Sequence, residues 1–240
     1  MEAVTNIAYN LERILQRIDR AARRAGRDSR DVRLVVVSKT HPVETIRAAV
    51  QAGVCCLGES YVEEAVTKIQ AFGTLEGFEW HMVGHVQSRK AKLVCQYFDY
   101  VHSLDRLKLA SLLDRYAVEQ KRRLPVLLEC NVSGEESKYG WPAWQEENWP
   151  ALIEPVTEII QKPNLQVRGL MTMAPYFNNP ELARPYFIKL RRLREFFKSN
   201  FPMLGWEELS MGMSGDFEPA IEEGATCVRI GTAIFGPREV

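Results

Sequence analysis

The stretch Arg33-Leu34-Val35-Val36-Val37-Ser38-Lys39-Thr40-His41-Pro42 decides the fold prediction. Its apolar residues follow one another without polar alternation, which is typical of a strand covered on both faces, as in a parallel sheet. Pro42 closes the segment, because the residue before a proline disfavours helix. Lys39 therefore lies at the carboxyl end of a buried strand, the end at which α/β folds bind their ligands.

Two interpretations of Lys39 are open at this point. A lysine in apolar surroundings loses its charge readily, which makes Lys39 a candidate Schiff-base amine. A lysine in a turn is more often simply solvated. The rest of the chain must decide between the two.

An alternation of strand and helix continues beyond this strand. The expected strands are 33–37, 53–58, 79–83, 100–103, 125–132, 165–173, 207–211 and 226–230. The expected helices between them are 42–52, 61–71, 91–97, 107–120, 156–161, 180–200 and 218–223. Eight such units predict an α/β fold, a single (β/α)8 TIM-type barrel over residues 33–236, with a doubly wound open sheet as the alternative. No linker rich in Pro, Gly and Ser divides the chain, so we expect residues 1–240 to form one domain.

An amphipathic helix is expected ahead of the barrel, within residues 1–30. Apolar residues recur at helical spacing between positions 5 and 25, and Gly26 is a plausible stop. The expected inward residues are Ile7, Leu11, Ile14, Leu15, Ile18, Ala21 and Ala22. Glu12 and Asp19 interrupt the arginines of the other face, which favours a solvated surface over a targeting peptide.

The alternation fails between Ser133 and Pro155, a segment that contains Trp141, Trp144 and Trp149. The segment is long, and its apolar residues show neither helical nor strand spacing. This predicts a long loop over the ligand-bearing face. We expect the tryptophans to pack this loop onto its own domain, because such packing is more common than a partner surface.

The composition is that of a globular protein without a dominant charge. The chain has 240 residues, 46% of them hydrophobic, and 31 basic residues balance 31 acidic ones. No global field therefore points to nucleic acid or to a membrane surface. No apolar run approaches the length of a membrane span, and the N-terminus lacks a signal-peptide core. We expect a cytoplasmic protein with neither a nucleic acid nor a membrane as partner.

Cysteine and histidine patterns do not predict a metal site. The five cysteines include no C-x-x-C pair, so buried reduced thiols are expected rather than disulfides or metal ligands. His81 and His85 are four residues apart, a spacing that places two zinc ligands on one face of a helix. Here a strand is predicted instead, and Gly84 lies between the two histidines, so this geometry is not expected. We assign both histidines to packing or to the polar lining of the barrel mouth.

Two loops near the C-terminus carry the groups that bind a phosphate. The first is Ser210-Met211-Gly212-Met213-Ser214-Gly215-Asp216-Phe217, and the second is Arg229-Ile230-Gly231-Thr232-Ala233-Ile234-Phe235-Gly236. Barrel enzymes often hold a phosphate between the loops after strands seven and eight, where backbone N–H groups and a helix N-terminus face the anion. Such a phosphate together with Lys39 suits an aldehyde-bearing phosphate ligand, and pyridoxal phosphate is the most economical candidate.

The chain resembles the pyridoxal phosphate homeostasis protein family, which is similar to the barrel domain of alanine racemase. The collinear motifs that carry this resemblance are Val37-Ser38-Lys39-Thr40, Gly58-Glu59-Ser60-Tyr61-Val62-Glu63-Glu64, Trp80-His81-Met82-Val83-Gly84, Gly169-Leu170-Met171, Ser210-Met211-Gly212-Met213-Ser214 and Val228-Arg229-Ile230-Gly231-Thr232-Ala233-Ile234-Phe235-Gly236. The resemblance implies that Lys39 forms an internal aldimine with pyridoxal phosphate. It also implies that Ser214, Gly231 and Thr232 bind the phosphate, that Arg229 faces the pyridine nitrogen, and that Ser60 and Met171 belong to the cofactor-binding set.

Two positions depart from the family pattern. Ser60 stands where the family usually has Asn, and Arg89 stands where it usually has Asn before a lysine, here Lys90. Ser60 is shorter than Asn, so water can replace a polar contact beside the cofactor ring. We expect these changes to affect the surroundings of the cofactor more than its binding.

Arg229 favours a cofactor-handling role over catalysis. A guanidinium is always charged and has only donors, so it keeps the ring nitrogen unprotonated and weakens the ring as an electron sink. In the racemases a tyrosine on a further β domain supplies the second proton transfer, and this chain ends at Val240 directly after the last barrel motif. We therefore expect binding, buffering or delivery of pyridoxal phosphate, with dependent apo-enzymes as partners and a monomeric state. The alternatives are a racemase-type enzyme that uses Tyr61 or His81, and a cofactor-free Schiff-base aldolase that acts on a sugar phosphate.

Overall fold

Eight parallel strands close into a barrel. The structure is a computed structural model that describes residues 2–73 and 77–236. The strands neighbour one another in the order β4-β3-β2-β1-β9-β8-β7-β5, and pairing of β4 with β5 closes the ring. Their bounds are β1 Arg33–Val37, β2 Cys56–Glu59, β3 Glu79–Met82, β4 Tyr100–Leu104, β5 Leu124–Asn131, β7 Leu165–Met171, β8 Glu208–Ser210 and β9 Cys227–Ile230. The predicted (β/α)8 barrel is confirmed, and the open sheet is excluded.

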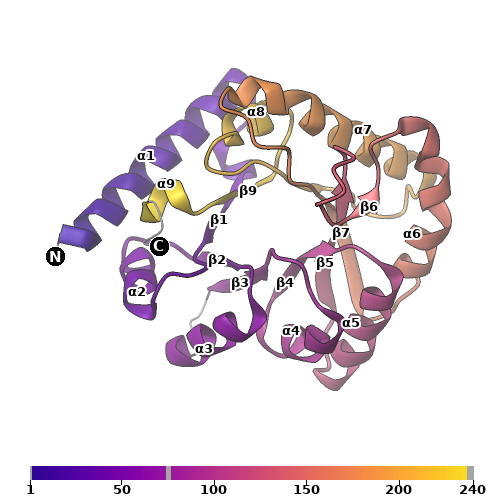
Figure 1. The fold of residues 1–240 in the computed structure, drawn as a ribbon, viewed down its shortest axis with the longest axis horizontal. Coiled ribbons are helices and arrows are strands. Elements are labelled where there is room, and N and C mark those ends of the chain that lie inside the picture. The colour runs from indigo at the N-terminus through magenta and orange to yellow at the C-terminus, as the bar shows by residue number, and fades with distance from the viewer. Residues whose placement is uncertain (1, 74–76, 237–240) are drawn as a thin grey trace.

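Helices surround the barrel (Figure 1). Their bounds are α1 Glu2–Arg24, α2 Val43–Gln51, α3 Val62–Phe72, α4 Ala91–Tyr97, α5 Leu107–Glu119, α6 Ile153–Ile160, α7 Arg184–Asn200, α8 Phe217–Glu222 and α9 Thr232–Phe235. Short 3-10 helices lie at η1 Ser29–Asp31, η2 Ser88–Lys90, η3 Glu146–Leu152 and η4 Pro180–Ala183. The predicted helix over 180–200 is therefore η4 continued by α7, and the four-residue helix α9 was not predicted.

The unalternating apolar run of β1 is explained by its two covered faces. Val36 packs in the large core between the strands and the helices. Val35 instead belongs to a cluster with Cys56, Val83 and Cys227 inside the barrel. Because successive strand residues point to opposite faces, both faces of β1 require apolar side chains.

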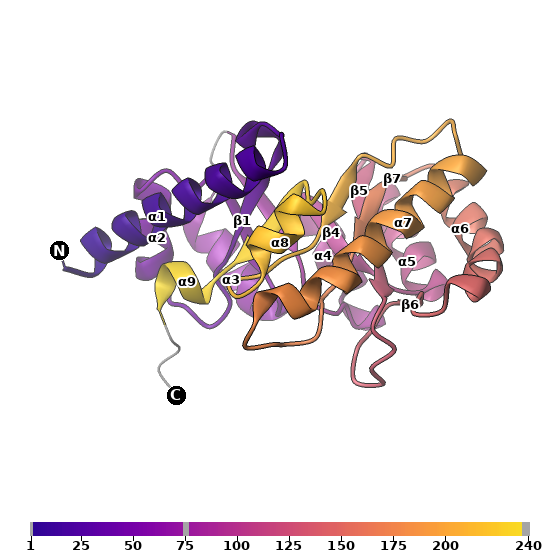
Figure 2. The same ribbon diagram turned by 90° about the horizontal axis from the view of Figure 1, so that it is seen from above.

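Helix α1 packs against α2, α8 and α9 (Figures 1 and 2). Six of the seven residues expected to face inward are buried, whereas Leu15 is 49% exposed. Leu15 therefore corrects the prediction: it lies just outside the apolar stripe formed by Ile7, Leu11, Ile14 and Ile18. Gly26 follows the helix with φ +66°, a conformation that glycine adopts without steric cost, as the predicted stop requires.

The segment 133–155 is more ordered than the predicted loop. It contains the short strand β6 (Trp141–Pro142), which pairs with β5, and the 3-10 helix η3. Helix α6 also begins earlier than expected, at Ile153. The segment packs onto its own domain as predicted, since Trp149 is buried and the Trp141 indole N–H donates to Leu104 O at 3.0 Å.

The cysteines are free thiols, and four of them are buried. Cys55 is exposed, contrary to the expected burial. Among the described residues, no helix combines the length and the apolar character that crossing a membrane requires.

Candidate functional site

A cavity of about 280 Å³ lies at the carboxyl ends of the strands. Figure 2 shows the segments that follow β5 and β7 extending from one side of the barrel, and the segment between α7 and β8 lying on the other. The described lining residues are Val37, Lys39, His41, Ser60, Val83, Met173, Tyr176, Phe177, Pro180, Ala183, Met213, Ser214, Gly215, Asp216, Arg229, Gly231 and Thr232. The cavity is near the lower end of the size range of small-molecule sites.

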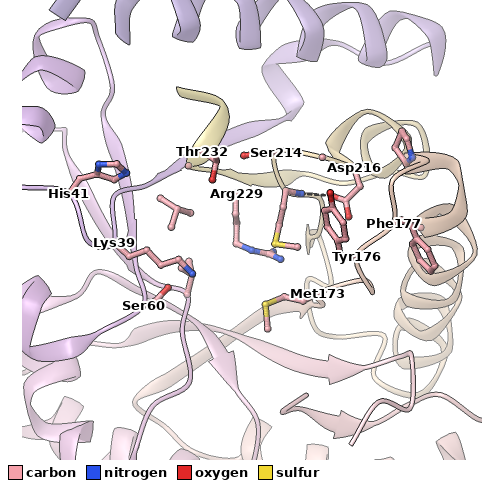
Figure 3. A pocket seen from close by; sticks show the side chains of 17 residues that line it. Lys39, His41, Ser60, Met173, Tyr176, Phe177, Ser214, Asp216, Arg229 and Thr232 are labelled. Atoms are coloured by element: carbon pink, nitrogen blue, oxygen red, sulfur yellow. Dashed lines mark hydrogen bonds between the residues drawn. The ribbon is translucent and has the colours of Figure 1, made fainter. Parts of the chain in front are cut away.

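The cavity brings together residues from six separate loops. Six of the seven predicted site residues line it: Lys39, Ser60, Ser214, Arg229, Gly231 and Thr232. In Figure 3 the Lys39 side chain enters from one side, Ser214 and Thr232 lie close together, and Arg229 lies between Lys39 and Tyr176.

Met171 does not line the cavity, which corrects its placement. It ends β7 and is fully buried with Tyr100 and Leu127 inside the barrel. Met173, two residues later, lines the cavity instead. Residues two positions apart in a strand point to the same side, as Met171 and Met173 do. Only Met173 lies beyond the end of the strand, where the cavity is.

The turn that carries Lys39 is held by two carboxylates. Ser38 is buried, and its hydroxyl donates to Glu59 Oε1 at 2.6 Å. Thr40 has φ +68°, a left-handed conformation that is costly for a β-branched residue. Its backbone N–H donates to Glu64 Oε1 at 2.6 Å, which compensates part of that cost. Lys39 is therefore positioned from both sides.

A buried ammonium joins these carboxylates. Lys68 on α3 is 4% exposed, and its Nζ donates to Ser38 O at 2.7 Å, to Glu59 Oε1 at 2.7 Å and to Glu64 Oε1 at 2.6 Å. All three ammonium hydrogens are thus used. Burial raises the pKa of Glu59, while its bonds from Lys68 and Ser38 act in the opposite direction. We call Glu59, Glu64 and Lys68 the lysine clamp.

The lysine clamp was not predicted from the sequence. Glu59 and Glu64 stand in a motif that was noted, Gly58-Glu59-Ser60-Tyr61-Val62-Glu63-Glu64, but no role was assigned to them. Glu59 ends a buried strand, and a carboxylate at such a position requires a partner. The sequence feature that could have predicted the lysine clamp is therefore this carboxylate at the end of a buried strand.

The two C-terminal loops meet at one end of the cavity. The Ser214 hydroxyl accepts from the backbone N–H of Ala233 at 3.3 Å, which joins the β8–α8 loop to the start of α9. A Cβ at Gly231 would lie 2.8 Å from Val37 O, so only glycine allows this close approach to β1. Asp216 accepts from Met213 N at 2.6 Å, and burial raises the pKa of its carboxyl group.

Arg229 supplies a buried cation to the cavity. It is 5% exposed, and burial lowers the pKa of its guanidinium. Its Nη1 donates to Ser210 Oγ at 2.5 Å and its Nη2 to Thr172 O at 2.8 Å. An amine, a guanidinium and two hydroxyls around one cavity fit a small ligand that carries an aldehyde and a phosphate.

The residues proposed for the alternative enzyme lie elsewhere. Tyr61 is 54% exposed and His81 is fully buried in the barrel, and neither is among the described residues that line the cavity. His85 Nδ1 lies 2.9 Å from Asp105 Oδ2, and the His85 ring stacks on Tyr139. Arg89 is exposed on η2 and donates to Gln87, away from the cavity.

Among the described residues, one group of potential metal ligands lies at the amino ends of β2 and β3. Ligand atoms of Cys56, Glu79 and His81 are within 4.8 Å of one another. However, His81 Nε2 already bonds Glu79 Oε2 at 3.1 Å, and Arg33 Nη1 is 3.6 Å from the same oxygen. A guanidinium at this distance opposes a second cation, so the cluster is better described as a hydrogen-bonded pair.

Several lining residues were not predicted. Tyr176 and Phe177 follow β7 and form the aromatic side of the cavity in Figure 3, and Tyr176 is 87% exposed. The His41 ring packs at a tilt of 33° against Phe235, with ring centroids 4.5 Å apart. The sequence signal for His41 was its position in the turn that follows the first strand, next to Lys39 and Thr40.

Glu129 on β5 is a buried acid beneath the cavity. Burial and the nearby Asp105 raise the pKa of its carboxyl from 4.5 to about 7, although Arg229 opposes the shift. Its Oε2 has no hydrogen-bond partner among the described residues. The folded state therefore favours the protonated form.

The substitution Glu129→Gln is expected to stabilise the fold only at high pH. Below about pH 4.5 the wild-type carboxyl is neutral in both folded and unfolded states, whereas above pH 7 it is charged in both and the folded state bears the burial penalty. We expect the free energy of unfolding of the variant to be about 2 kcal/mol higher than that of the wild type at pH 8. This difference should shrink towards pH 5. Urea unfolding at both pH values measures this difference. Glu136→Gln, at an exposed position, is the control, and a pH-independent gap for Glu129→Gln would contradict the assignment.

Comparison with known proteins relates the chain to two groups that share its barrel. The sequence model of the alanine racemase N-terminal domain matches residues 9–239. The pyridoxal phosphate homeostasis protein of Aquifex aeolicus is 44% identical over 234 residues, which cover 98% of this chain and 99% of that protein. The structure of PipY from Synechococcus elongatus with PLP bound matches with a TM-score of 0.83 at 33% identity, covering 96% of this chain and 100% of that one. Alanine racemase from Bartonella henselae shares the fold, with a TM-score of 0.69 at 15% identity, covering 99% of this chain and 61% of that one.

Proposed function

The chain belongs to the pyridoxal phosphate homeostasis protein family, and from this premise we propose that it binds pyridoxal 5′-phosphate in the cavity through Lys39 and serves the homeostasis of that cofactor. One observation carries the proposal: a single cavity is lined by the Lys39 amine, the Arg229 guanidinium and the hydroxyls of Ser214 and Thr232. These groups match the aldehyde, the ring nitrogen and the phosphate of the cofactor in chemical type.

Each residue has one role in this proposal. The Lys39 amine bonds to the aldehyde carbon, and the carbonyl oxygen leaves as water. Ser214, Gly231 and Thr232 hold the phosphate, and Arg229 donates to the ring nitrogen. When bound, the cofactor supplies an electron-withdrawing ring conjugated to the lysine nitrogen. The lysine clamp keeps the amine directed into the cavity.

We further propose that the protein holds the cofactor rather than using it in catalysis. A guanidinium has only donors, so Arg229 leaves the ring nitrogen unprotonated and the ring a weak electron sink. Tyr61 and His81, the groups considered for a second proton transfer, do not belong to the described cavity lining. The curated relative in Aquifex aeolicus is named a homeostasis protein, not an enzyme. We propose a cytoplasmic monomer that passes the cofactor to apo-enzymes.

Two assays test this role. The loaded protein, incubated with single enantiomers of alanine in deuterium oxide, is expected to leave the α-hydrogen in place, and exchange at enzymatic rates would overturn the holding role. An apo-enzyme that requires the cofactor is expected to regain activity when mixed with the loaded protein. If it regains none over the lifetime of the complex, delivery is excluded.

The double variant Ser214→Ala, Thr232→Val is expected to weaken binding of pyridoxal phosphate by about 100-fold, because two bonds to the charged phosphate are lost and each costs about 1.5 kcal/mol. Equilibrium titration of the visible band of the bound cofactor measures this loss. Pyridoxal, which lacks the phosphate, is the matched ligand and should bind the variant and the wild type alike. An equal loss for both ligands would place the phosphate elsewhere.

A further inference from the structure

A line of buried side chains crosses the inside of the barrel from the cavity to the opposite face. Arg229 Nη1 bonds Ser210 Oγ at 2.5 Å, and Ser210 Oγ lies 2.9 Å from His102 Nδ1. His102 Nε2 lies 2.8 Å from His81 Nδ1, and His81 Nε2 lies 3.1 Å from Glu79 Oε2. The first four residues are at most 5% exposed, whereas the Glu79 side chain is 47% exposed at the amino end of β3.

With both histidines neutral, the two ends of this line determine the direction of each hydrogen bond along it. A guanidinium only donates and a carboxylate only accepts. Ser210 Oγ accepts from Arg229, and its own hydrogen is then available to His102 Nδ1. With that nitrogen accepting, neutral His102 carries its hydrogen on Nε2 and donates to His81.

The Glu79 carboxylate, which only accepts, determines the hydrogen positions at the other end of the line. His81 Nδ1 accepts from His102, so neutral His81 carries its hydrogen on Nε2 and donates to Glu79. Burial lowers the pKa of His102 well below its ordinary value, and the bond from His81 lowers the pKa of Glu79. Both shifts favour neutral His102 and ionised Glu79, as this arrangement requires.

We infer that Ser210, His102 and His81 are positioning residues for Arg229, anchored by Glu79 at the opposite face of the barrel. The inference rests on the proposed function, because it concerns how Arg229 is held towards the bound cofactor. Ser210 accepts one Nη1 hydrogen and Thr172 O accepts from Nη2, so the guanidinium plane is fixed by contacts on its barrel side. Its remaining donors are then available to the cavity.

Within the part of the chain that the structure describes, three groups neighbour the line: the Cys227 thiol beside Ser210, Arg33, whose Nη1 lies 3.6 Å from Glu79 Oε2, and Tyr100. The Tyr100 ring stacks on His81 with centroids 5.0 Å apart and meets His102 edge-on. The Tyr100 hydroxyl itself has no hydrogen-bond partner among the described residues. Tyr100→Phe therefore alters the same interior without breaking the line, which makes it a matched control.

The variants His102→Leu and Ser210→Ala test the inference. Each is expected to weaken binding of pyridoxal phosphate by about tenfold. Ser210→Ala removes the hydroxyl that accepts from Arg229, and His102→Leu removes the next partner along the line. His102→Asn keeps an acceptor where Nδ1 lies and should recover most of the affinity. Tyr100→Phe should bind as the wild type does. Thermal unfolding of each unloaded variant shows that the fold is kept.

A double-mutant cycle separates positioning from general damage. If His102 acts through Arg229, His102→Leu should cause no further loss of affinity in the Arg229→Gln background. The same tenfold loss in both backgrounds, or wild-type affinity in His102→Leu, would overturn the inference. A wild-type protein that forms no covalent complex with pyridoxal phosphate would instead overturn the proposed function, so the two failures are distinguishable.

Discussion

Replacing Lys39 with alanine is expected to abolish the visible absorption band of bound pyridoxal phosphate completely. Lys39 is the one lysine among the described residues that line the cavity, and an alanine has no amine to bond the aldehyde carbon. Ser214, Thr232 and Arg229 remain in place, so residual binding should be non-covalent and weaker. Spectral titration of purified wild-type and variant protein measures the effect.

Two controls isolate the role of the Lys39 amine. Lys39→Arg keeps a positive charge but offers no reactive amine, and it should lose the band as fully as the alanine variant. Lys108→Ala, at an exposed position on α5, should behave as the wild type does. A band that persists in Lys39→Ala at wild-type intensity would remove Lys39 from the proposal.

The substitution Lys68→Met is expected to lower the free energy of unfolding by about 3–5 kcal/mol, because it leaves the buried carboxylate of Glu59 without its cation. It also removes the bond to Ser38 O, so the turn that carries Lys39 should loosen and cofactor affinity should fall. Denaturant unfolding of the unloaded protein measures the stability, and the spectral titration measures the affinity.

The double variant Glu59→Gln, Lys68→Met is the control for charge. The double variant removes the fully buried carboxylate together with its cation and leaves only the partly exposed carboxylate of Glu64 without Lys68, so it should be more stable than Lys68→Met alone. Loss of less than about 1 kcal/mol in the single variant would show that the lysine clamp contributes little.

The barrel could be predicted because its determinants are local. The strand β1 and several later strands are continuous apolar runs, because both of their faces are covered. Each strand is followed by a segment whose apolar residues recur at helical spacing. The meeting of the two C-terminal loops at one cavity was also predictable, since Ser214 and Gly231 follow neighbouring parallel strands, whose carboxyl ends lie on the same face of the barrel.

The lysine clamp and the line from Arg229 to Glu79 depend on contacts between distant segments. Lys68 has the spacing of an ordinary surface lysine on α3, and only the packing of α3 over β1 and β2 buries it. His81 was assigned to packing or to the barrel mouth, whereas closure of the barrel brings it against His102 in the interior. No local pattern contains that pairing.

The end of β7 shows the limit of pattern reasoning at a strand terminus. The predicted strand ran to Met173, but β7 ends at Met171. Met171 was assigned to the site through the resemblance, from the motif Gly169-Leu170-Met171, whereas Met173 lines the cavity. An error of this size moves a side chain from the cavity to the core.

The location of the covalent linkage tests the central claim most directly. Wild-type protein loaded with pyridoxal phosphate is reduced with borohydride, which makes the linkage permanent, and is then digested and analysed by mass spectrometry. We expect the cofactor on the peptide that contains Lys39, and we expect it to be absent from that peptide when the protein is Lys39→Arg. Stable labelling of another lysine, with Lys39 unmodified, would contradict the central claim.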